Sequence, residues 1–431
     1  MTWTKPEIID NVPTKYGWTV SHPDRLELGY MTDIGSGTYL QCQHGIIIQD
    51  NVQIGGNCNI YSADTIGGNA GMVTIKEGAC IGTQSIIMPG CTIGMGAIVM
   101  ANSFVPANTN IPDGESWGGT PARPHHNVYV VTGGTGSIGR SVVERLLLDD
   151  TVDAVRVYSR DEAKQAAMKA DLERTHSGYD CTRIRYILGD IRDKEKLVRA
   201  LHEASVVIHA AALKRVETCE YNPDEAGDVN WNGTRMVISA CFDTNVKKML
   251  MVSTDKAVNP TNAMGTSKAM AEKVTLNSNL IARKHGNDAP RPSFYVARLG
   301  NVLESRGSVL PTWRDQALRD KEIIVTDRNA TRYFIENKDV ATFILDCLER
   351  PAGLYVPDCK VMKIGDLADA FVDSCTGTYP IGIRETEMRP GERQHEFMVS
   401  DEEALERGLK PEQYQSEKAT PLTFSQIKEL L

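Results

Sequence analysis

The chain has 431 residues, which is enough for two or three domains, and its formal net charge is −9 at pH 7. That charge leaves no basic excess to neutralise nucleic-acid phosphates. Its ten cysteines show neither CxxC pairs nor zinc spacing, which predicts free thiols in a reducing cytoplasm and no metal site. No apolar run approaches the roughly 20 residues that span a bilayer, so we expect a cytoplasmic protein without a membrane partner.

Isoleucine and valine recur every six residues in the first part of the chain. One run holds Ile48, Ile54, Ile60 and Ile66, and a second continues over residues 75–111. A period of six fits neither a helix nor a flat strand, but it fits a β-solenoid whose coil has three short sides. Residues 65–74 interrupt the period, so we predict a loop that projects from the coil.

Small residues follow many of these positions, and residues 117–123 read Trp-Gly-Gly-Thr-Pro-Ala-Arg. Residues 25–124 thereby resemble the hexapeptide-repeat acyltransferases. The resemblance implies a left-handed parallel β-helix, a trimer, acetyl-CoA as donor and a histidine base. Ala63 occupies the place of that histidine, and a methyl group cannot take a proton. His44 is the acyltransferase candidate that remains, and a hydrogen-bonded corner residue is the alternative. Domain 1–126 is therefore either an acetylating domain or a scaffold.

A glycine-rich turn follows the apolar segment 128–132. Its glycines let a backbone turn tightly, approach a pyrophosphate and pack a helix closely on a strand. Residues 141–148 continue with helical periodicity, and a helix N-terminus offers free N–H groups to phosphates. We therefore predict that domain 127–431 has a doubly wound α/β sheet of the Rossmann type; an ordinary tight loop is the alternative. The candidate cofactor ligands in the turn are Gly133, Thr135, Gly136, Ser137, Ile138 and Gly139.

Three further strand ends carry cofactor candidates. Ser159 and Arg160 follow the predicted strand 154–158, where an NAD-selective fold usually places an acid. Serine and arginine instead suit the 2′-phosphate of NADP. Asp190 is expected to accept the adenine amino group, and three alanines after strand 206–209 let the backbone approach the nicotinamide. The additional cofactor candidates are Asp190, Ile191, Ala210, Ala211, Ala212 and Lys214.

An apolar strand delivers Ser253, Thr254, Asp255 and Lys256 to its carboxyl end, where α/β sheets carry their sites. Lys268 follows on a predicted helix. A surface salt bridge would be the plain interpretation of the Asp-Lys pair. At the mouth of a cofactor crevice, the same pair suits an acid and a base.

Segments 132–139, 158–162, 211–215, 253–257, 298–302, 305–309 and 389–396 carry a second resemblance. Residues 127–400 resemble the extended short-chain dehydrogenase/reductases, and more narrowly the UDP-N-acetylglucosamine 4,6-dehydratases of the polysaccharide-biosynthesis family. Met264 departs from the usual YxxxK pattern, although larger membrane-linked members also carry methionine there. A non-catalytic NADP-binding protein is the alternative that Met264 and Ala63 leave open.

The resemblance implies that NADP takes hydride from C4 of a UDP-hexose and returns it to C6 after water leaves. Lys256 would remove the C5 proton, and Asp255 would protonate the C6 hydroxyl. Lys268 would hold the nicotinamide ribose, and Thr254 or a water would replace the tyrosine. Desolvation is expected to lower the pKa of Lys256 so that it acts as a base. The C5 configuration of the product stays open.

The resemblance also implies the ligands of the UDP-sugar partner. Arg389 and Arg393 would bind the diphosphate, because guanidinium groups suit phosphate oxygens; Arg306 and Arg332 are weaker candidates. Glu396 and His395 are expected to order their loop, and residues from 401 onward to form a peripheral helical unit. A trimeric coil joined to a dimerising dehydrogenase suggests a trimer or hexamer. The substrate candidates are Lys214, Asn301, Arg306, Arg389 and Arg393.

Overall fold

The computed structural model describes residues 4–124, 127–175, 178–244, 246–284, 292–375, 380–389, 391–406 and 408–431. The chain divides into two compact units, Met1–His126 and Asn127–Leu431. Within the described residues, no helix has the length and apolar character needed to cross a membrane.

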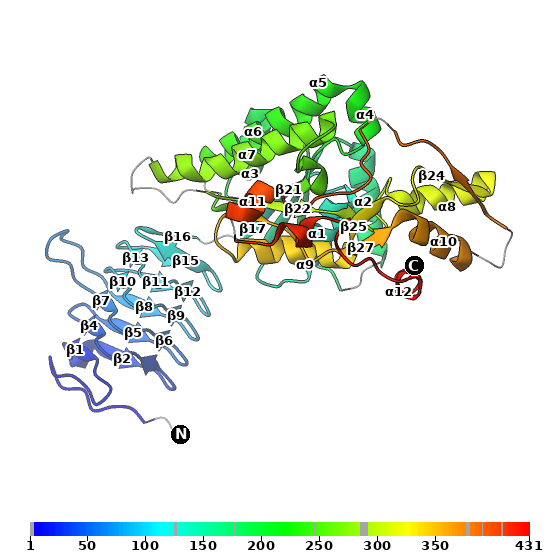
Figure 1. Cartoon of the computed structure of the whole chain (residues 1–431). Helices are drawn as coiled ribbons and strands as arrows, with labels where there is room; N and C mark the ends of the chain where they lie inside the picture. The colour runs from blue at the N-terminus through cyan, green and yellow to red at the C-terminus, as the bar shows by residue number, and fades with distance from the viewer. Residues whose placement is uncertain are drawn as a thin grey trace. The chain divides into compact units, whose positions relative to one another are not determined.

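The first unit is a coil of short strands that alternate among three sheets (Figure 1). The first sheet contains β1 (Thr19–Ser21), β4 (Tyr39–Gln41), β7 (Asn59–Tyr61), β10 (Ile86–Ile87) and β13 (Phe104–Val105). The second contains β2 (Leu26–Leu28), β5 (Ile46–Ile48), β8 (Val73–Ile75), β11 (Thr92–Ile93) and β14 (Asn110–Ile111). The third contains β3 (Asp33–Ile34), β6 (Gln53–Ile54), β9 (Cys80–Ile81), β12 (Ile98–Val99), β15 (Ser116–Gly119) and β16 (Ala122–Pro124).

The six-residue period marks the core of this coil. Ile75 pairs with Ile93 and Ile93 with Ile111 in parallel register, and all three side chains are fully buried. Each of these strands thus turns its periodic residue inward, and the longer strands β5 and β8 also bury Ile46 and Val73, because side chains alternate between the two faces of a strand. The core positions of the two runs are Ile48, Ile54, Ile60, Ile75, Ile81, Ile87, Ile93, Val99, Val105 and Ile111.

Ile66 does not belong to this core, and its inclusion in the first run was wrong. Its side chain is 99% exposed. The Asp64 carboxylate accepts the backbone N–H groups of Ile66 and Gly67, each at 3.0 Å, and so holds a tight turn after β7. The projecting loop ends before β8, so Thr74 lies in a strand.

The second unit contains a parallel sheet of order β19-β18-β17-β20-β21-β22-β26. The order reverses between β17 and β20, and such a reversal is where open α/β sheets bind their ligands. The strands are β17 (Val128–Thr132), β18 (Ala154–Ser159), β19 (Ile184–Leu188), β20 (Val206–His209), β21 (Lys248–Thr254), β22 (Ser293–Leu299) and β26 (Leu354–Tyr355).

Helices cover both faces of this sheet, which confirms the predicted Rossmann-type fold (Figure 1). On one face lie α1 (Ser137–Leu147), α2 (Glu162–Thr175) and α9 (Asn337–Leu348). On the other lie α3 (Lys194–Leu201), α6 (Gly233–Phe242) and α7 (Ala263–Lys284). Near the sheet are α4 (Val216–Tyr221), α5 (Pro223–Ala226) and a π-helical turn, Gly227–Asn232.

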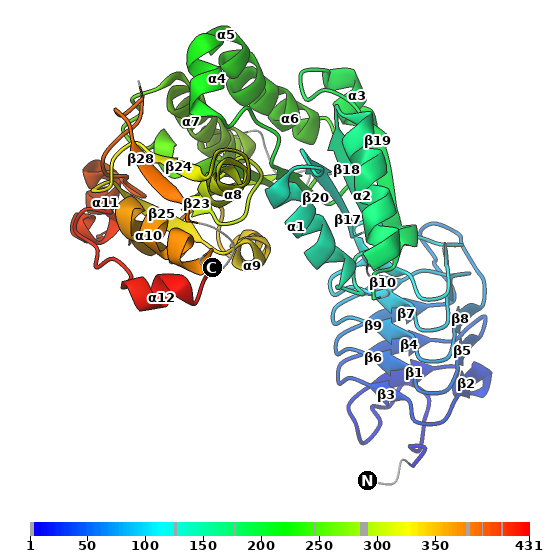
Figure 2. The ribbon, with the colours of Figure 1, turned by 90° about the vertical axis from the view of Figure 1, so that its right-hand side faces the viewer.

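The remaining elements form a smaller subdomain of the second unit (Figure 2). Trp313 and Phe371 pack together in its core, with ring centroids 5.7 Å apart. Its strands are β23 (Asn301–Val302), β24 (Glu322–Val325), β25 (Thr331–Ile335), β27 (Lys360–Lys363) and β28 (Gly382–Glu385). Its helices are α8 (Val309–Asp320), α10 (Ile364–Ser374) and α12 (Phe424–Lys428).

The segment from residue 391 to 406, called the arm below, packs against the main sheet. It ends in α11 (Asp401–Glu406), whose Glu403 forms an ion pair of 2.8 Å with the buried Arg298 of β22. Beyond the arm, Ser416 is fully buried. The segment after residue 401 thus forms short helices and is mostly exposed, as predicted, but Ala404, Ser416 and Ile427 anchor it in the core.

Candidate active site

The glycine turn between β17 and α1 is closed tightly against the neighbouring strand end. Gly133 has a φ of +67°, and a Cβ there would lie 2.7 Å from the amide nitrogen of Ala211. A Cβ on Gly139 would overlap the carbonyl oxygen of Gly133. Both positions therefore require glycine, and the turn leaves the N-terminus of α1 open to an anion.

Arg306 lies against this turn. Its backbone N–H donates to Ser137 Oγ over 2.9 Å, and its guanidinium donates to the carbonyl oxygen of Thr135. The structure thus places Arg306 beside the expected cofactor pyrophosphate, whereas the sequence suggested the sugar diphosphate.

The carboxyl end of β18 carries a network of charged side chains. Arg160, whose side chain is 50% exposed, lies 3.4 Å from Asp190. Arg192 contacts the same carboxylate over 2.8 Å, and hydrogen bonds from Arg192 lower the pKa of Asp190 to about 2. Asp190 is therefore already engaged by two guanidinium groups, and Ile191 is buried beneath it.

Lys164 is a cation that the sequence interpretation missed. It lines a cavity of about 660 Å³ together with Thr135, Ser137 and Arg306. Its Nζ is paired with Asp161 over 2.8 Å. The available signal was its position in the first turn of α2, four residues after Arg160.

A larger cavity of about 840 Å³ lies at the carboxyl ends of β20, β21 and β22. It brings together residues that are far apart in the sequence. The predicted site residues that line it are Ile138, Ala210, Ala212, Lys214, Thr254, Lys256, Met264, Lys268, Asn301 and Arg389.

The Asp-Lys pair lies in a 3₁₀ turn, Asp255–Ala257, that follows β21. Lys256 Nζ donates to Asp255 Oδ1 over 2.9 Å, and Thr254 Oγ1 donates to the same oxygen over 2.9 Å. Asp255 is fully buried. Its two hydrogen-bond donors, Thr254 and Lys256, both line the large cavity. The buried Asp255 carboxylate is therefore linked to the cavity by the hydrogen bonds from these two side chains.

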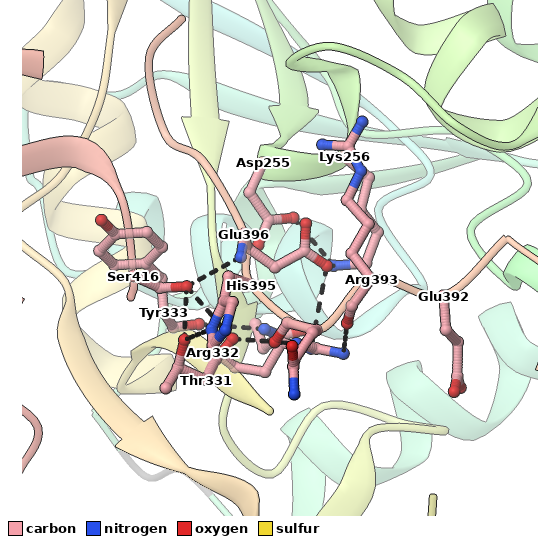
Figure 3. A network of polar contacts seen from close by, with 12 residues as sticks. Asp255, Lys256, Thr331, Arg332, Tyr333, Glu392, Arg393, His395, Glu396 and Ser416 are labelled. Carbon is pink, nitrogen blue, oxygen red and sulfur yellow. Dashed lines mark hydrogen bonds and ion pairs between the residues drawn. The ribbon is translucent and has the colours of Figure 1, made fainter. Parts of the chain in front are cut away.

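A second carboxylate, Glu396 of the arm, lies 3.5 Å from Lys256 Nζ (Figure 3). Burial alone would lower the pKa of Lys256, but the charges of Asp255 and Glu396 oppose that effect and raise it. The expected lowering of the Lys256 pKa was wrong, because these two carboxylates outweigh the effect of burial. Burial raises the pKa of Glu396; the Lys256 charge opposes this shift and the Asp255 charge adds to it.

Lys268 and Met264 lie on the first turns of α7 and line the large cavity. Lys268 Nζ donates to the carbonyl oxygen of Val252 over 2.7 Å, and desolvation lowers its pKa to about 8. Met264 is 4% exposed and packs with Cys219 and Ala226. A thioether supplies no proton acceptor of useful basicity here, and Thr254 is a predicted residue whose hydroxyl lines the same cavity.

The arginines expected to bind the diphosphate have different surroundings. Arg389 lines the large cavity and is 56% exposed, with Glu217 at 3.9 Å. Arg393 instead donates to the carbonyl oxygen of Val258 over 2.9 Å. Arg332 donates to the carbonyl oxygens of Arg393 and Gln394 over 2.6 and 2.8 Å. Arg393 and Arg332 thus fasten the arm, while Arg389 faces the cavity.

In the first unit, His44 lies at an exposed corner between β4 and β5. Its backbone N–H donates to Ser62 Oγ over 2.8 Å. The neighbouring Ala63 forms an isolated antiparallel bridge with Ala70 at the base of the projecting loop. The exposed corner position is compatible with both interpretations of His44.

The glycine turn, the parallel sheet and the cavity at its switch point define a Rossmann-type dinucleotide-binding protein. The chain belongs to the family described as polysaccharide biosynthesis proteins, which matches residues 129–418.

Two curated relatives illustrate the range of this family. An inverting UDP-N-acetylglucosamine 4,6-dehydratase of Campylobacter jejuni is 40% identical over 278 residues, which are 64% of this chain and 78% of that protein. A UDP-glucose 4-epimerase of Rickettsia rickettsii is 36% identical over 279 residues, again 64% of this chain and 78% of that protein.

Two solved structures have a similar fold. Pen from Bacillus thuringiensis is 27% identical, with a TM-score of 0.64 over 70% of this chain and 96% of that chain. DesIV of Streptomyces venezuelae, a dTDP-glucose 4,6-dehydratase with NAD and TYD bound, is 22% identical with a TM-score of 0.54 over 66% of this chain and 92% of that chain. The similarity to DesIV concerns the fold alone.

Proposed function

We propose that this chain is a nucleotide-sugar 4,6-dehydratase that converts UDP-N-acetylglucosamine, or a close UDP-hexose, to a 4-keto-6-deoxy sugar. The observation that carries the proposal is the Thr254-Asp255-Lys256 cluster, which opens through Thr254 and Lys256 onto a cavity that Lys268 also lines. The dehydratase relative from Campylobacter jejuni supports the same assignment.

In the proposed reaction, a bound nicotinamide cofactor would hold the hydride that leaves C4 of the sugar until it is returned to C6. Thr254 Oγ1 accepts the proton of the C4 hydroxyl and passes its own proton to Asp255 Oδ1, to which it is already hydrogen-bonded. Lys256 removes the C5 proton, which the 4-ketone makes acidic. The proton on Asp255 then returns through the Thr254 hydroxyl to the C6 hydroxyl, and water leaves. Lys268 orients the cofactor ribose.

The direct test incubates the full chain with its nicotinamide cofactor and UDP-N-acetylglucosamine, followed by mass spectrometry of the sugar. The expected product is lighter by one water, and the cofactor returns to its oxidised form. A product of unchanged mass but inverted C4 would instead assign the 4-epimerase reaction named for the Rickettsia relative. Unchanged substrate would reject both reactions.

We also propose NADP as the cofactor, with Ser159 and Arg160 beside the 2′-phosphate and Lys164 and Arg306 adding positive charge near the turn. The Arg160→Leu variant is expected to bind NADP roughly ten- to a hundredfold more weakly, because a hydrogen bond to a charged group contributes about 1.5–3 kcal/mol. NAD affinity should not change. Titration calorimetry with both cofactors measures the difference.

The matched control for this variant is Arg199→Leu, on α3, whose side chain is 79% exposed. It should leave both affinities unchanged. An equal loss of NADP and NAD binding by Arg160→Leu would contradict the assignment to the 2′-phosphate.

For the first unit we propose a left-handed β-helix that acts as a non-catalytic scaffold, and a trimeric or hexameric assembly. Ala63, which stands in place of the expected histidine base, supports the scaffold role over acetyl transfer. Thiol release from acetyl-CoA in the presence of amino-sugar nucleotides would reverse that choice. A monomer by light scattering would contradict the assembly.

A further inference from the structure

Lys256 lies between two buried carboxylates that belong to different parts of the chain (Figure 3). Asp255 Oδ1 is 2.9 Å from its Nζ and Glu396 Oε1 is 3.5 Å away. Asp255 is fully buried and Glu396 is 3% exposed. Among the described residues, the second oxygen of each carboxylate, Oδ2 and Oε2, has no hydrogen-bond partner.

A hydrogen bond from its backbone N–H group fixes the position of Glu396. Its N–H donates to Ser416 Oγ over 2.8 Å, and that hydroxyl also lies 2.8 Å from Thr331 Oγ1. The carboxylate then extends toward a cavity of about 190 Å³, which Lys256 and Arg332 also line. Lys256 lines both this cavity and the larger one, whereas Glu396 lines only the smaller one.

The charges around Lys256 create a difficulty for its proposed role as a base. Asp255 and Glu396 both favour the ammonium form, which has no lone pair to accept a proton. The cations that face Glu396 are Lys256 itself, Arg332 and Arg393. Arg332 is 3.8 Å from the Glu396 carboxylate and also favours its ionised form, but burial is the largest effect on this carboxyl and favours its neutral form.

We propose that Glu396 is a positioning residue that takes the extra proton of Lys256 and so makes the lysine basic. An N–H bond of the ammonium breaks, an O–H bond forms on Glu396, and the buried pair becomes neutral without any change in net charge. Neutral Lys256 then accepts the C5 proton, and both transfers reverse when hydride returns to C6. This step rests on the proposed dehydratase function.

The Glu396→Gln variant is expected to lower kcat by roughly 10²–10⁴-fold, the usual contribution of general acid–base catalysis. Oxidation at C4 should continue, so the reduced cofactor should accumulate on adding substrate. Lys256 must then lose its proton to solvent, so the acid limb of the kcat–pH profile should move to higher pH. Deuterium exchange at C5 in D₂O should slow in parallel.

Three further variants separate this role from support of the arm. Ser416→Ala loosens the arm but keeps the carboxylate, so it should leave the pH limb in place. Glu396→Asp should recover part of the activity together with the wild-type limb. Glu417→Gln, at an exposed position, is the matched control for the substitution itself. A Glu396→Gln enzyme with the wild-type pH limb would overturn the proposal.

A second measurement does not depend on activity. The pH dependence of Lys256 acylation by acetic anhydride, read by peptide mass spectrometry, gives the pKa of this lysine directly. Removing the Glu396 carboxylate should lower that pKa, and an unchanged titration would reject the coupling. If the wild-type enzyme fails to dehydrate the sugar, the proposed function falls, and this titration still decides whether the two side chains share a proton.

Discussion

The Lys256→Met variant is expected to lose turnover of UDP-N-acetylglucosamine by at least roughly 10²–10⁴-fold, the range that loss of a general base produces. The methionine side chain that replaces the lysine has no group to accept the C5 proton. The cofactor should stay bound, because the glycine turn does not depend on this side chain. Product formation by mass spectrometry and bound cofactor by absorbance measure the two effects separately.

The thermal stability of the Lys256→Met variant is expected to depend on pH. Without the ammonium group, the pKa of Glu396, already raised by burial, should rise further. A carboxyl whose folded-state pKa exceeds its unfolded value stabilises the fold at low pH and loses that contribution as the pH rises through the folded pKa. The melting temperature of Lys256→Met should therefore fall with rising pH relative to the wild type.

Two other substitutions make this experiment decisive. Lys256→Arg keeps a cation between the carboxylates but supplies a group that does not deprotonate in proteins, so it should restore stability without restoring activity. Lys273→Met, at an exposed position on α7, should change neither. Near-native turnover by Lys256→Met would show that another group removes the C5 proton.

The sequence predicted the parts of this protein that local patterns determine. The six-residue period identified core positions of the first unit, because an inward side chain at the same place in each short strand is a repeated local requirement. The glycine spacing located the turn after β17, since a Cβ at Gly133 would meet Ala211. The apolar segment before them placed Thr254, Asp255 and Lys256 at a strand end. The α/β pattern predicted the neighbouring strands.

The errors involve contacts between distant segments. Glu396 reaches Lys256 only because the arm folds back, and no periodicity in the sequence signals that return. Burial alone gave the wrong sign for the Lys256 pKa shift, because the charges of Asp255 and of this second carboxylate together outweigh it. Arg306 likewise donates to Thr135, which is 171 residues away along the chain. The prediction that Ile66 lies in the core was wrong for a local reason, because the Asp64 carboxylate stabilises a turn that interrupts the repeat.

Arg298 joins the arm to the main sheet through a buried ion network. Its guanidinium lies 2.6 Å from Glu272 of α7 and 2.8 Å from Glu403 of the arm. It also donates to the carbonyl oxygen of Met398 over 2.8 Å. Arg298 is 1% exposed and Glu272 4% exposed. Burial disfavours the charge, but Glu403 and Glu272 together raise the pKa of Arg298, so the guanidinium remains charged.

The Arg298→Met variant should destabilise the second unit by about 3–5 kcal/mol, the cost of removing one partner from a buried ion pair. Glu272 would keep its burial but lose its counter-ion, and the arm that carries Glu396 would lose its main attachment to β22. Urea unfolding measures the first effect. Limited proteolysis measures the second, and cleavage within residues 391–406 should precede global unfolding.

The control for this prediction is Arg314→Met, because Arg314 pairs with Glu304 on the surface and both side chains are nearly half exposed. An exposed pair contributes about 0–1 kcal/mol, so this variant should unfold almost like the wild type. Adding Glu272→Gln to Arg298→Met should recover part of the lost stability, since the uncompensated carboxylate is then gone. Equal unfolding free energies for Arg298→Met and Arg314→Met would show that the network does not fasten the arm.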